Sequence, residues 1–549
     1  MSPATQASYL EREVSELRDA LTAARRREGG SLTIKRLERM VLAREERLKK
    51  QTDAVKDVGI SFEETGIDYV VVDEAHGYKN LETVSNIRDA QIAGAKRATD
   101  LHMKLQWLRE RHGHRVATLA TATPIANSVT EAHVMGRYLR PGLLRAAGVE
   151  HFDDWAATFG QTVTEIEMAP TGGGDYRMKT RFARFANVPE MLRMWHVFAD
   201  VKTAEDLQLP APGLRVHHGR DGQQRTGPRT VVIPAGPEII DYLSQLAERA
   251  ERVRSRSVDP TEDNMLKISG DGRKAALDMR LIDGRPTPGG CKLERAAAAI
   301  GRIWNEHKDA RYLDADGTPS SIPGALQIVF CDLSTPGDGW NAYDELRRLV
   351  AAAGVPAHQV RYVHEARNDA EKGRLFAACR AGHVAVLIGS TEKMGIGTNI
   401  QARAVALHHL DCPWRPADIE QREGRILRQG NQNPEVEILR YVVERSFDAY
   451  SWQTVERKAK FIAQVTRGRL DTRAIEDIGD QALSFTEVKA LASGDPLVLE
   501  HARVSNDLTR LERLERAWQR NRQQLRYAVA SASERHHARV AEVAALDEA

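Results

Sequence analysis

The sequence is poor in cysteine, in long apolar runs and in net charge. Its four cysteines lie far apart and form no CxxC pair, which argues against a disulfide framework or a zinc site and fits a reducing cytoplasm. No apolar stretch approaches the ~20 residues that span a bilayer, and the polar N-terminus lacks the apolar core of a signal peptide. We therefore expect a cytoplasmic protein with no membrane partner.

The balance of charge is close to neutral, because 79 basic residues face 77 acidic ones and leave a net charge of +2. Bulk electrostatics thus neither require nor exclude nucleic acid as a partner. Any basic binding surface has to be local.

The glycine-rich phosphate-binding loop of many NTPases, GxxxxGK followed by Ser or Thr, is also missing. The nearest approximation, Gly270-Asp271-Gly272-Arg273-Lys274, has the wrong spacing. This absence counts against independent ATP binding, although other parts of an NTPase site are present in the sequence.

The first half of the chain predicts a helical segment followed by a βαβ unit. Residues 7–58 carry apolar residues at helical spacing, interrupted at Gly29-Gly30, and predict a helical hairpin. An apolar strand at 69–72, a helix at 97–112 and a second strand at 116–120 follow. The remaining residues of this half, 131–200, are predicted to be mainly helical, and 210–230 a linker.

A second α/β pattern runs from about residue 292 to 445. Its strands and helices alternate, which predicts a parallel, doubly wound sheet and therefore an α/β fold class. The predicted strands are 325–331, 359–363, 384–388, 405–410 and 436–443, and the helices are 341–353, 368–381 and 419–427. Beyond about residue 483, apolar residues at seven-residue intervals predict a helical tail with a coiled-coil seam.

Two adjacent carboxylates follow the first apolar strand. Asp73 and Glu74 come directly after Val70–Val72, and His76 comes next but one. Sites in parallel sheets lie at the carboxyl ends of strands, where such a pair can hold Mg²⁺ and activate water. Capping of a following helix is the alternative interpretation, and the next strand, which ends at Thr121-Ala122-Thr123-Pro124, argues against it.

A glycine-containing segment follows the strand at 384–388. In the run from Gly389 to Asn399, glycines such as Gly395 and Gly397 would let backbone amides approach a phosphate of a nucleotide or a nucleic-acid strand. A tight strand-to-helix turn is the alternative interpretation of this segment.

A pair of arginines forms the third group of candidate site residues. Arg425 and Arg428 are three residues apart, one helical turn, with Gln421 a turn earlier. Arginines so placed can stabilise the charge of a transferring phosphate. Two surface arginines on a charged helix are the alternative, and the position of the pair after the loop Asp411–Pro416 favours a site.

Taken together, these motifs resemble those of superfamily 2 helicases. The residues DEAH at 73–76, TATP at 121–124, the loop at 395–399 and QxxxRxxRxG at 421–430 are similar to motifs II, III, V and VI of that superfamily, and most closely to the Snf-type DNA translocases. More narrowly, Phe62-Glu63-Glu64, Tyr78-Lys79-Asn80-Leu81 and residues 447–462 resemble very large phage- and plasmid-encoded helicase proteins that are often joined to an adenine DNA methylase.

The resemblance implies a role for each motif residue. ATP and Mg²⁺ are the implied cofactors, with Asp73 as the Mg²⁺ ligand and Glu74, Arg425 and Arg428 as the catalytic residues. Residues implied to bind the nucleotide are Asp73, His76, Gly395, Gly397 and Gln421. Those implied to couple the lobes or to contact nucleic acid are Thr121, Thr123, Thr398 and Asn399.

The resemblance also implies two RecA-like lobes with parallel sheets that clamp ATP between them. Since the family's phosphate loop precedes its DEAH motif, we expect lobe 1 to be incomplete at its N-terminus and the sheet edge at Val70–Val72 to be exposed. The expected segments are a helical hairpin (1–60), partial lobe 1 with a helical insertion (61–205), linker and helical insertion (206–290), lobe 2 (291–470) and a helical, coiled-coil tail (471–549).

The function expected from these motifs is that of an ATP-dependent DNA helicase or translocase. The chain would be a fragment or split subunit that needs an upstream segment or a partner chain with the phosphate loop, and its substrate would be duplex DNA without sequence preference. Two alternatives are a non-catalytic nucleic-acid-binding scaffold and an accessory to DNA modification or anti-restriction in a mobile element.

Overall fold

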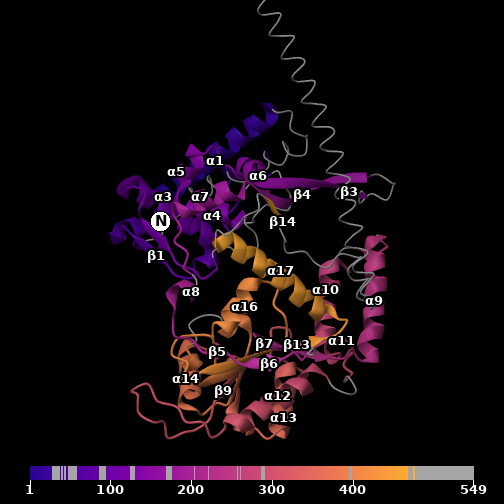
Figure 1. The fold of residues 1–549 in the computed structure, drawn as a ribbon. Coiled ribbons are helices and arrows are strands. Elements are labelled where there is room, and N and C mark those ends of the chain that lie inside the picture. Colours follow the sequence, from indigo (N-terminus) through magenta and orange to yellow (C-terminus); the bar gives the residue numbers. More distant parts are fainter. Residues whose placement is uncertain are drawn as a thin grey trace, which may run out of the picture.

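The computed structural model shows two α/β regions joined by helices and short strands (Figure 1). It describes residues 1–26, 38, 41–42, 45–46, 59–83, 85, 94–123, 130–168, 176–202, 204–219, 222–255, 257–259, 261–285, 291–394, 399–467 and 474–476. We call residues 59–202 lobe 1 and residues 213–467 lobe 2. Among the described helices, none is long and apolar enough to cross a membrane.

Lobe 1 is built around a two-stranded parallel sheet. Strand β1 (Val70–Val72) pairs with β2 (Ala117–Leu119), with Val71 opposite Thr118, and α3 (Lys96–His112) connects the strands. This arrangement confirms the predicted strand–helix–strand unit. The helices that share its core are α4 (Thr130–Leu139), α5 (Pro141–Ala146), α6 (Phe152–Phe159) and α7 (Val188–His196).

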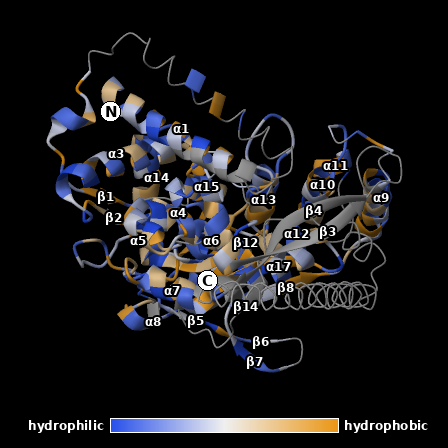
Figure 2. Ribbon diagram, turned by 90° about the horizontal axis from the view of Figure 1, so that it is seen from above, coloured by the Kyte–Doolittle hydropathy of each residue, from blue (hydrophilic) through white to orange (hydrophobic). Residues whose placement is uncertain are grey.

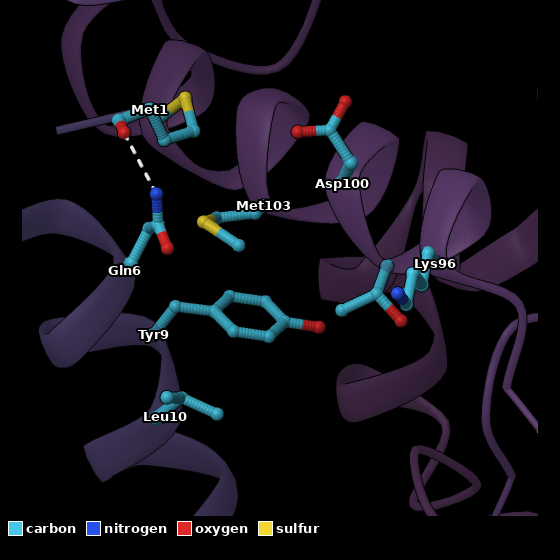
Figure 3. Close-up of a pocket in the computed structure, with 8 residues that line it drawn as sticks. Met1, Gln6, Tyr9, Leu10, Lys96, Asp100 and Met103 are labelled. Carbon is cyan, nitrogen blue, oxygen red and sulfur yellow. Dashed lines mark hydrogen bonds between the residues drawn. The ribbon is translucent and has the colours of Figure 1, made fainter. Parts of the chain in front are cut away.

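The N-terminal helix α1 (Pro3–Arg26) lies against α3. Its Tyr9 hydroxyl is 2.9 Å from Nδ1 of the buried His102, and the Ser2 amide donates to Glu63. A cavity of about 200 Å³ lies between α1 and α3, and Figure 3 shows Met1, Gln6, Tyr9 and Met103 around it. No predicted site residue lines this cavity. The second helix of the predicted hairpin lies mostly outside the described residues.

Lobe 2 contains a seven-stranded sheet in the order β10-β11-β9-β12-β13-β5, with β8 also paired to β13. All of these pairs are parallel. The strands are β5 (Gly213–Leu214), β8 (Arg229–Ile233), β9 (Leu326–Phe330), β10 (Val360–Tyr362), β11 (Val386–Gly389), β12 (Ala404–His409) and β13 (Glu435–Val443).

Helices cover both faces of this sheet, as predicted for a doubly wound fold. Along β9, Leu326, Ile328 and Phe330 join one core cluster and Val329 joins the other. The first cluster includes residues of α14 (Asp369–Ala381) and α15 (Thr391–Met394); the second includes α9 (Pro237–Arg254), α10 (Met265–Leu277), α12 (Lys292–His307) and α13 (Ala342–Ala352). In Figure 2 the helices carry blue as well as orange positions, consistent with one buried face each.

Two stretches differ from the predicted secondary structure. The stretch predicted to be mainly helical contains an antiparallel hairpin of β3 (Gly160–Met168) and β4 (Tyr176–Ala186). The predicted linker contains β5, β8 and a small hairpin of β6 (Val216–His218) and β7 (Gln224–Thr226), so the sheet of lobe 2 begins before residue 291. Both errors arise because strand pairing with distant residues, rather than local periodicity, fixes these short elements.

After β13, helix α17 (Phe447–Arg467) packs against α10 and α16 (Pro416–Glu423). Strand β14 (Ala474–Glu476) then adds to β4 in lobe 1, with Ile475 opposite Phe185. The chain therefore passes from lobe 1 to lobe 2 and pairs with lobe 1 again. The predicted coiled-coil tail lies outside the described residues.

Candidate active site between the two lobes

The two predicted carboxylates lie where β1 ends. The backbone of Glu74 is left-handed, with φ 51° and ψ 45°, and its amide donates to Oδ1 of Asp73 at 2.8 Å. A residue other than glycine in this conformation costs about 1–3 kcal/mol, and such strain concentrates at functional sites. Asp73 is exposed and Glu74 is partly exposed, and only a short 3₁₀ turn (Ala75–Tyr78) follows them rather than a long helix.

The segment after the carboxylates is fixed to the end of β2. The amide of Ala75 donates to the carbonyl of Ala120, and the Ala120 amide donates to the carbonyl of Val72. One residue further on, Thr121 Oγ1 lies 3.2 Å from His76 Nδ1 and accepts from the amide of Thr123. The structure thus brings the predicted coupling threonines next to the predicted carboxylate motif.

His76 connects this site to lobe 2. Its Nδ1 is 3.2 Å from Glu74 Oε2, and its Nε2 is 3.4 Å from Nε2 of Gln421. His76 therefore joins a lobe 1 carboxylate to a lobe 2 amide side chain.

The arginine pair follows helix α16, which carries Gln421. Burial lowers the pKa of Arg425; the charge of Arg428 lowers it further, and the charge of Glu74 opposes the shift. Helix α16 ends at Glu423, so Arg425 and Arg428 lie in the turns that follow it and the predicted helix through residue 427 was too long. The amide of Arg425 donates to the carbonyl of Arg422, which retains a helix-like turn.

The glycine-containing segment is described only at its ends. Gly389 closes β11, where a Cβ would come within 2.8 Å of the Met394 side chain, so a larger residue here would force Met394 to shift. Asn399 is exposed, and its carbonyl accepts from Arg380 Nη1 at 2.9 Å. The predicted contacts of Gly395, Gly397 and Thr398 lie outside the described residues.

Asp73 fits the needs of a magnesium–nucleotide complex. One of its oxygens accepts from the Glu74 amide, and the exposed carboxylate retains further lone pairs for a cation. Mg²⁺ takes one or two protein carboxylates and completes its shell with water and substrate phosphates. Within the described part of the chain, no three His, Cys, Asp or Glu side chains gather as a self-sufficient metal site, so the substrate would have to supply ligands.

A buried arginine at the base of the site was not singled out from the sequence. Arg422 is fully buried; its Nε donates to Thr391 Oγ1 at 2.8 Å, and its Nη2 pairs with Asp332 at 2.7 Å and Asp411 at 2.9 Å. Thr391 follows β11, Asp332 follows β9 and Asp411 follows β12. The signal in the sequence was an acidic residue just after each of two apolar strands, at 332 and at 411.

The charges in this cluster are compensated. Burial opposes ionisation of Asp332, but the charge of Arg422 and hydrogen bonds from Thr391 outweigh it, so the pKa of Asp332 lies below its usual range. The second oxygen of Asp411 accepts from the amides of Asp332 and Leu333. Arg422, Asp332, Asp411 and Thr391, which we call the Arg422 cluster, therefore hold the carboxyl ends of three strands together.

Comparisons with known proteins agree with this two-lobed site. Residues 1–203 match the family described as "Probable helicase domain", and residues 326–430 match the "Helicase conserved C-terminal domain". The first range contains His76 and the second contains Gln421, so helicase-related domains lie on both sides of the contact between these residues. The fold is α/β with two RecA-like lobes, as expected.

The chain is also similar to "Defense against restriction protein B" of Escherichia phage P1. The two are 23% identical over 527 residues, and the match covers 74% of this chain but 23% of that protein. The chain thus spans less than a quarter of the length of this curated relative.

Proposed function

We propose that the chain is the motor portion of an ATP-dependent DNA helicase or translocase of superfamily 2, in its Snf-type branch. The observation that carries the proposal is the contact of His76 with Gln421 across the lobes. It joins the loop of the carboxylates in lobe 1 to the helix that precedes Arg425 and Arg428 in lobe 2, as hydrolysis of a nucleotide held between two lobes requires.

In this proposal each site residue has a defined task. Mg²⁺ held by Asp73 would supply positive charge next to the phosphates. Asp73 holds the cation, and Glu74 orients the attacking water and takes its proton. Arg425 and Arg428 stabilise the charge on the transferring phosphoryl group.

The coupling residues connect hydrolysis to movement. His76 and Gln421 sense whether the lobes are closed, while Thr121 and Thr123 link the carboxylate loop to the end of β2. Gly395, Gly397, Thr398 and Asn399 belong to the segment that we assign to phosphate contacts. The partner is duplex DNA, bound without sequence preference.

We further propose that the phosphate loop comes from a polypeptide segment outside these 549 residues. The bare side of the first sheet supports this: Val71 is 69% exposed, and Ile60, Ile67 and Tyr69 are also exposed. Parallel sheets are normally covered on both faces. Within the described residues β1 pairs only with β2, so a strand added at the other edge of β1 would end next to Asp73, where a phosphate loop is needed. The greater length of the phage relative is consistent with such a segment.

Comparing ATP hydrolysis with and without that segment tests the proposal. The isolated chain should bind Mg-ATP weakly and turn it over near background, because it lacks the loop that supplies most phosphate contacts. Joining a segment with GxxxxGK[ST] should give a DNA-stimulated rate on the order of 1–100 s⁻¹, and Glu74→Gln should abolish it. An isolated chain that hydrolyses ATP at that rate, with Glu74→Gln inactive, would contradict the need for another segment.

DNA binding is expected of the motor. We expect sequence-independent binding of duplex DNA that weakens steeply between two salt concentrations. No binding at low salt by a folded sample would contradict both the motor and a nucleic-acid-binding scaffold, and these two are separated by ATP hydrolysis that Glu74→Gln abolishes. A second candidate, an accessory role in anti-restriction within a mobile element, rests on the name of the phage relative, and a restriction-challenge assay with and without the gene tests it.

A further inference from the structure

One arginine of lobe 2 holds a backbone conformation that its side chain disfavours. Arg445, in the turn between β13 and α17, has a φ of 52°, which lies in the left-handed region. The Cβ atom makes this region unfavourable for residues other than glycine, asparagine and aspartate. Turns with this conformation usually contain one of those residues, so an arginine is unusual here.

The other residues with a positive φ differ from Arg445 in an instructive way. Among the described residues other than glycine, they are Glu74, Asn187 and Gln208. Asn187 is of a type that tolerates the conformation, and Gln208 follows helix α8 (Ala204–Leu207), where left-handed residues are common. Glu74 lies in the candidate active site just after β1. Arg445 resembles Glu74, because it also follows the carboxyl end of a strand.

Contacts on both sides of Arg445 fix the turn. The amide of Glu444 donates to the carbonyl of Ile233, which holds the end of β13 beside β8. On the other side, Ser446 Oγ donates to the carbonyl of Val443 at 2.8 Å. The chain therefore has to change direction at Arg445, and surroundings of this kind maintain a strained residue.

The side chain of Arg445 adds no described contact to the fold. It is exposed, and within the described part of the chain no residue forms a hydrogen bond or an ion pair with its guanidinium. The acidic residue three positions further on, Asp448, pairs instead with the buried Lys292. The unfavourable backbone of Arg445 thus has no compensating contact within the fold, and strain of this kind concentrates at functional sites.

The chemistry of the guanidinium indicates what it binds. The group is always charged, and its fixed donors match the oxygens of a phosphate. Functional groups of parallel sheets gather at the carboxyl ends of strands, and Arg445 lies at this edge together with Asp411, from which the chain leads into α16. We propose that Arg445 binds a phosphate of the DNA backbone. This inference rests on the DNA binding proposed above and adds a contact outside the motifs from which that binding was expected.

Binding of duplex DNA without nucleotide tests this contact. Arg445→Asn removes the guanidinium and supplies a residue that tolerates the left-handed region, so it should raise the melting temperature. The same variant should weaken binding of two duplexes of unrelated sequence about three- to tenfold at low salt. The slope of log affinity against log salt should become shallower by about 0.9, as expected for one lost phosphate contact. Arg445→Lys, which retains the charge, should keep the wild-type slope.

Arg311 provides a matched control. It is exposed like Arg445, and its neighbour Tyr312 bonds to Asn433, two residues before β13 begins, so it lies toward the opposite edge of the sheet. Arg311→Asn removes the same charge and should leave the affinity and the salt slope unchanged. Equal losses in Arg311→Asn and Arg445→Asn would show an effect of net charge and overturn the inference.

The remaining outcomes separate this inference from the proposed function. Unchanged affinity and salt slope in Arg445→Asn would overturn the contact and leave the proposed function intact. Weaker binding with an unchanged slope, or with a lower melting temperature, would also overturn the contact, because it would assign the arginine a structural role. Absence of DNA binding by the folded wild-type chain overturns both.

Discussion

The two parallel sheets of this molecule have similar apolar strands but very different surroundings. In lobe 2, every residue of β9 is buried, with helices on both faces. In lobe 1, the central residue of β1, Val71, is 69% exposed, although its neighbour Val72 is buried. A run of β-branched residues thus predicts a strand in both places, while burial depends on how many elements surround it.

The comparison suggests where stability resides. Lobe 2 encloses its polar clusters and has strands on both sides of β9. Lobe 1 relies on the helices packed on one side of a two-stranded sheet, and a sheet that small is marginal by itself. Substitutions at equivalent positions of the two lobes should therefore differ in cost.

The largest difference is expected for ion pairs. Lys292 is fully buried in lobe 2, pairs with Asp448 and donates to the Leu410 carbonyl. Lys292→Met would leave Asp448 buried without its counter-charge and should lower the free energy of unfolding by about 3–5 kcal/mol. Lys104→Met in lobe 1 breaks an exposed pair with Asp100 and should cost about 0–1 kcal/mol. Urea denaturation measures both, and equal costs would contradict the comparison.

The next difference concerns the strands themselves. Ile328→Ala at the centre of β9 creates a cavity in a closed core and should cost about 2–5 kcal/mol. Val71→Ala at the centre of β1 removes an exposed side chain and should change stability by less than about 0.5 kcal/mol. If Val71→Ala proves as destabilising as Ile328→Ala, the outer side of the first sheet is covered in solution.

Self-association measurements should show whether the exposed residues of β1 promote contacts between copies of the chain. Unpaired strand edges with exposed apolar residues promote association, and lysine opposes it. Val71→Lys should make the isolated chain more monomeric in light scattering at high concentration. Leu266→Lys, at a similarly exposed apolar position in lobe 2, is the control and should have little effect. Equal effects would point to general solubility instead of this edge.

The smallest effect is expected at the junction of the N-terminal helix with lobe 1. Burial opposes ionisation of Glu63, but hydrogen bonds from Thr5, Ser2 and its own backbone lower its pKa from 4.5 to about 2. A lowered carboxyl pKa stabilises the fold above about pH 4.5, and this contribution is lost as the pH falls toward 2. Glu63→Gln should therefore lower the melting temperature at neutral pH. It should also reduce the fall in melting temperature between about pH 4.5 and pH 2. An unchanged pH profile would show that this carboxylate does not anchor α1.

The sequence predicted the features that depend on neighbouring residues. The strand before Asp73 and Glu74, the βαβ unit and the alternating elements of lobe 2 follow from local apolar patterns, and the structure confirms them. The resemblance assigned His76 and Gln421 to nucleotide binding, and the structure places the two residues 3.4 Å apart across the lobes.

The features that depend on distant partners were missed. Strand β8 is assigned through its pairing with β13, and the β3–β4 hairpin interrupts a stretch that was predicted to be mainly helical. Arg422 looked like one more charged residue on a helix, because Asp332, Thr391 and Asp411 become its neighbours only when three strand ends meet. No local pattern distinguishes a buried arginine from an exposed one.

The return of the chain to lobe 1 has a mechanical consequence. The chain joins the lobes between residues 202 and 213, and beyond α17 strand β14 is hydrogen-bonded to β4 of lobe 1. A body attached at one point can swing and twist in any direction, whereas a body attached at two points keeps one free axis. Rotation about the line through both attachments stretches neither of them. Such a rotation would change the distance between His76 and Gln421.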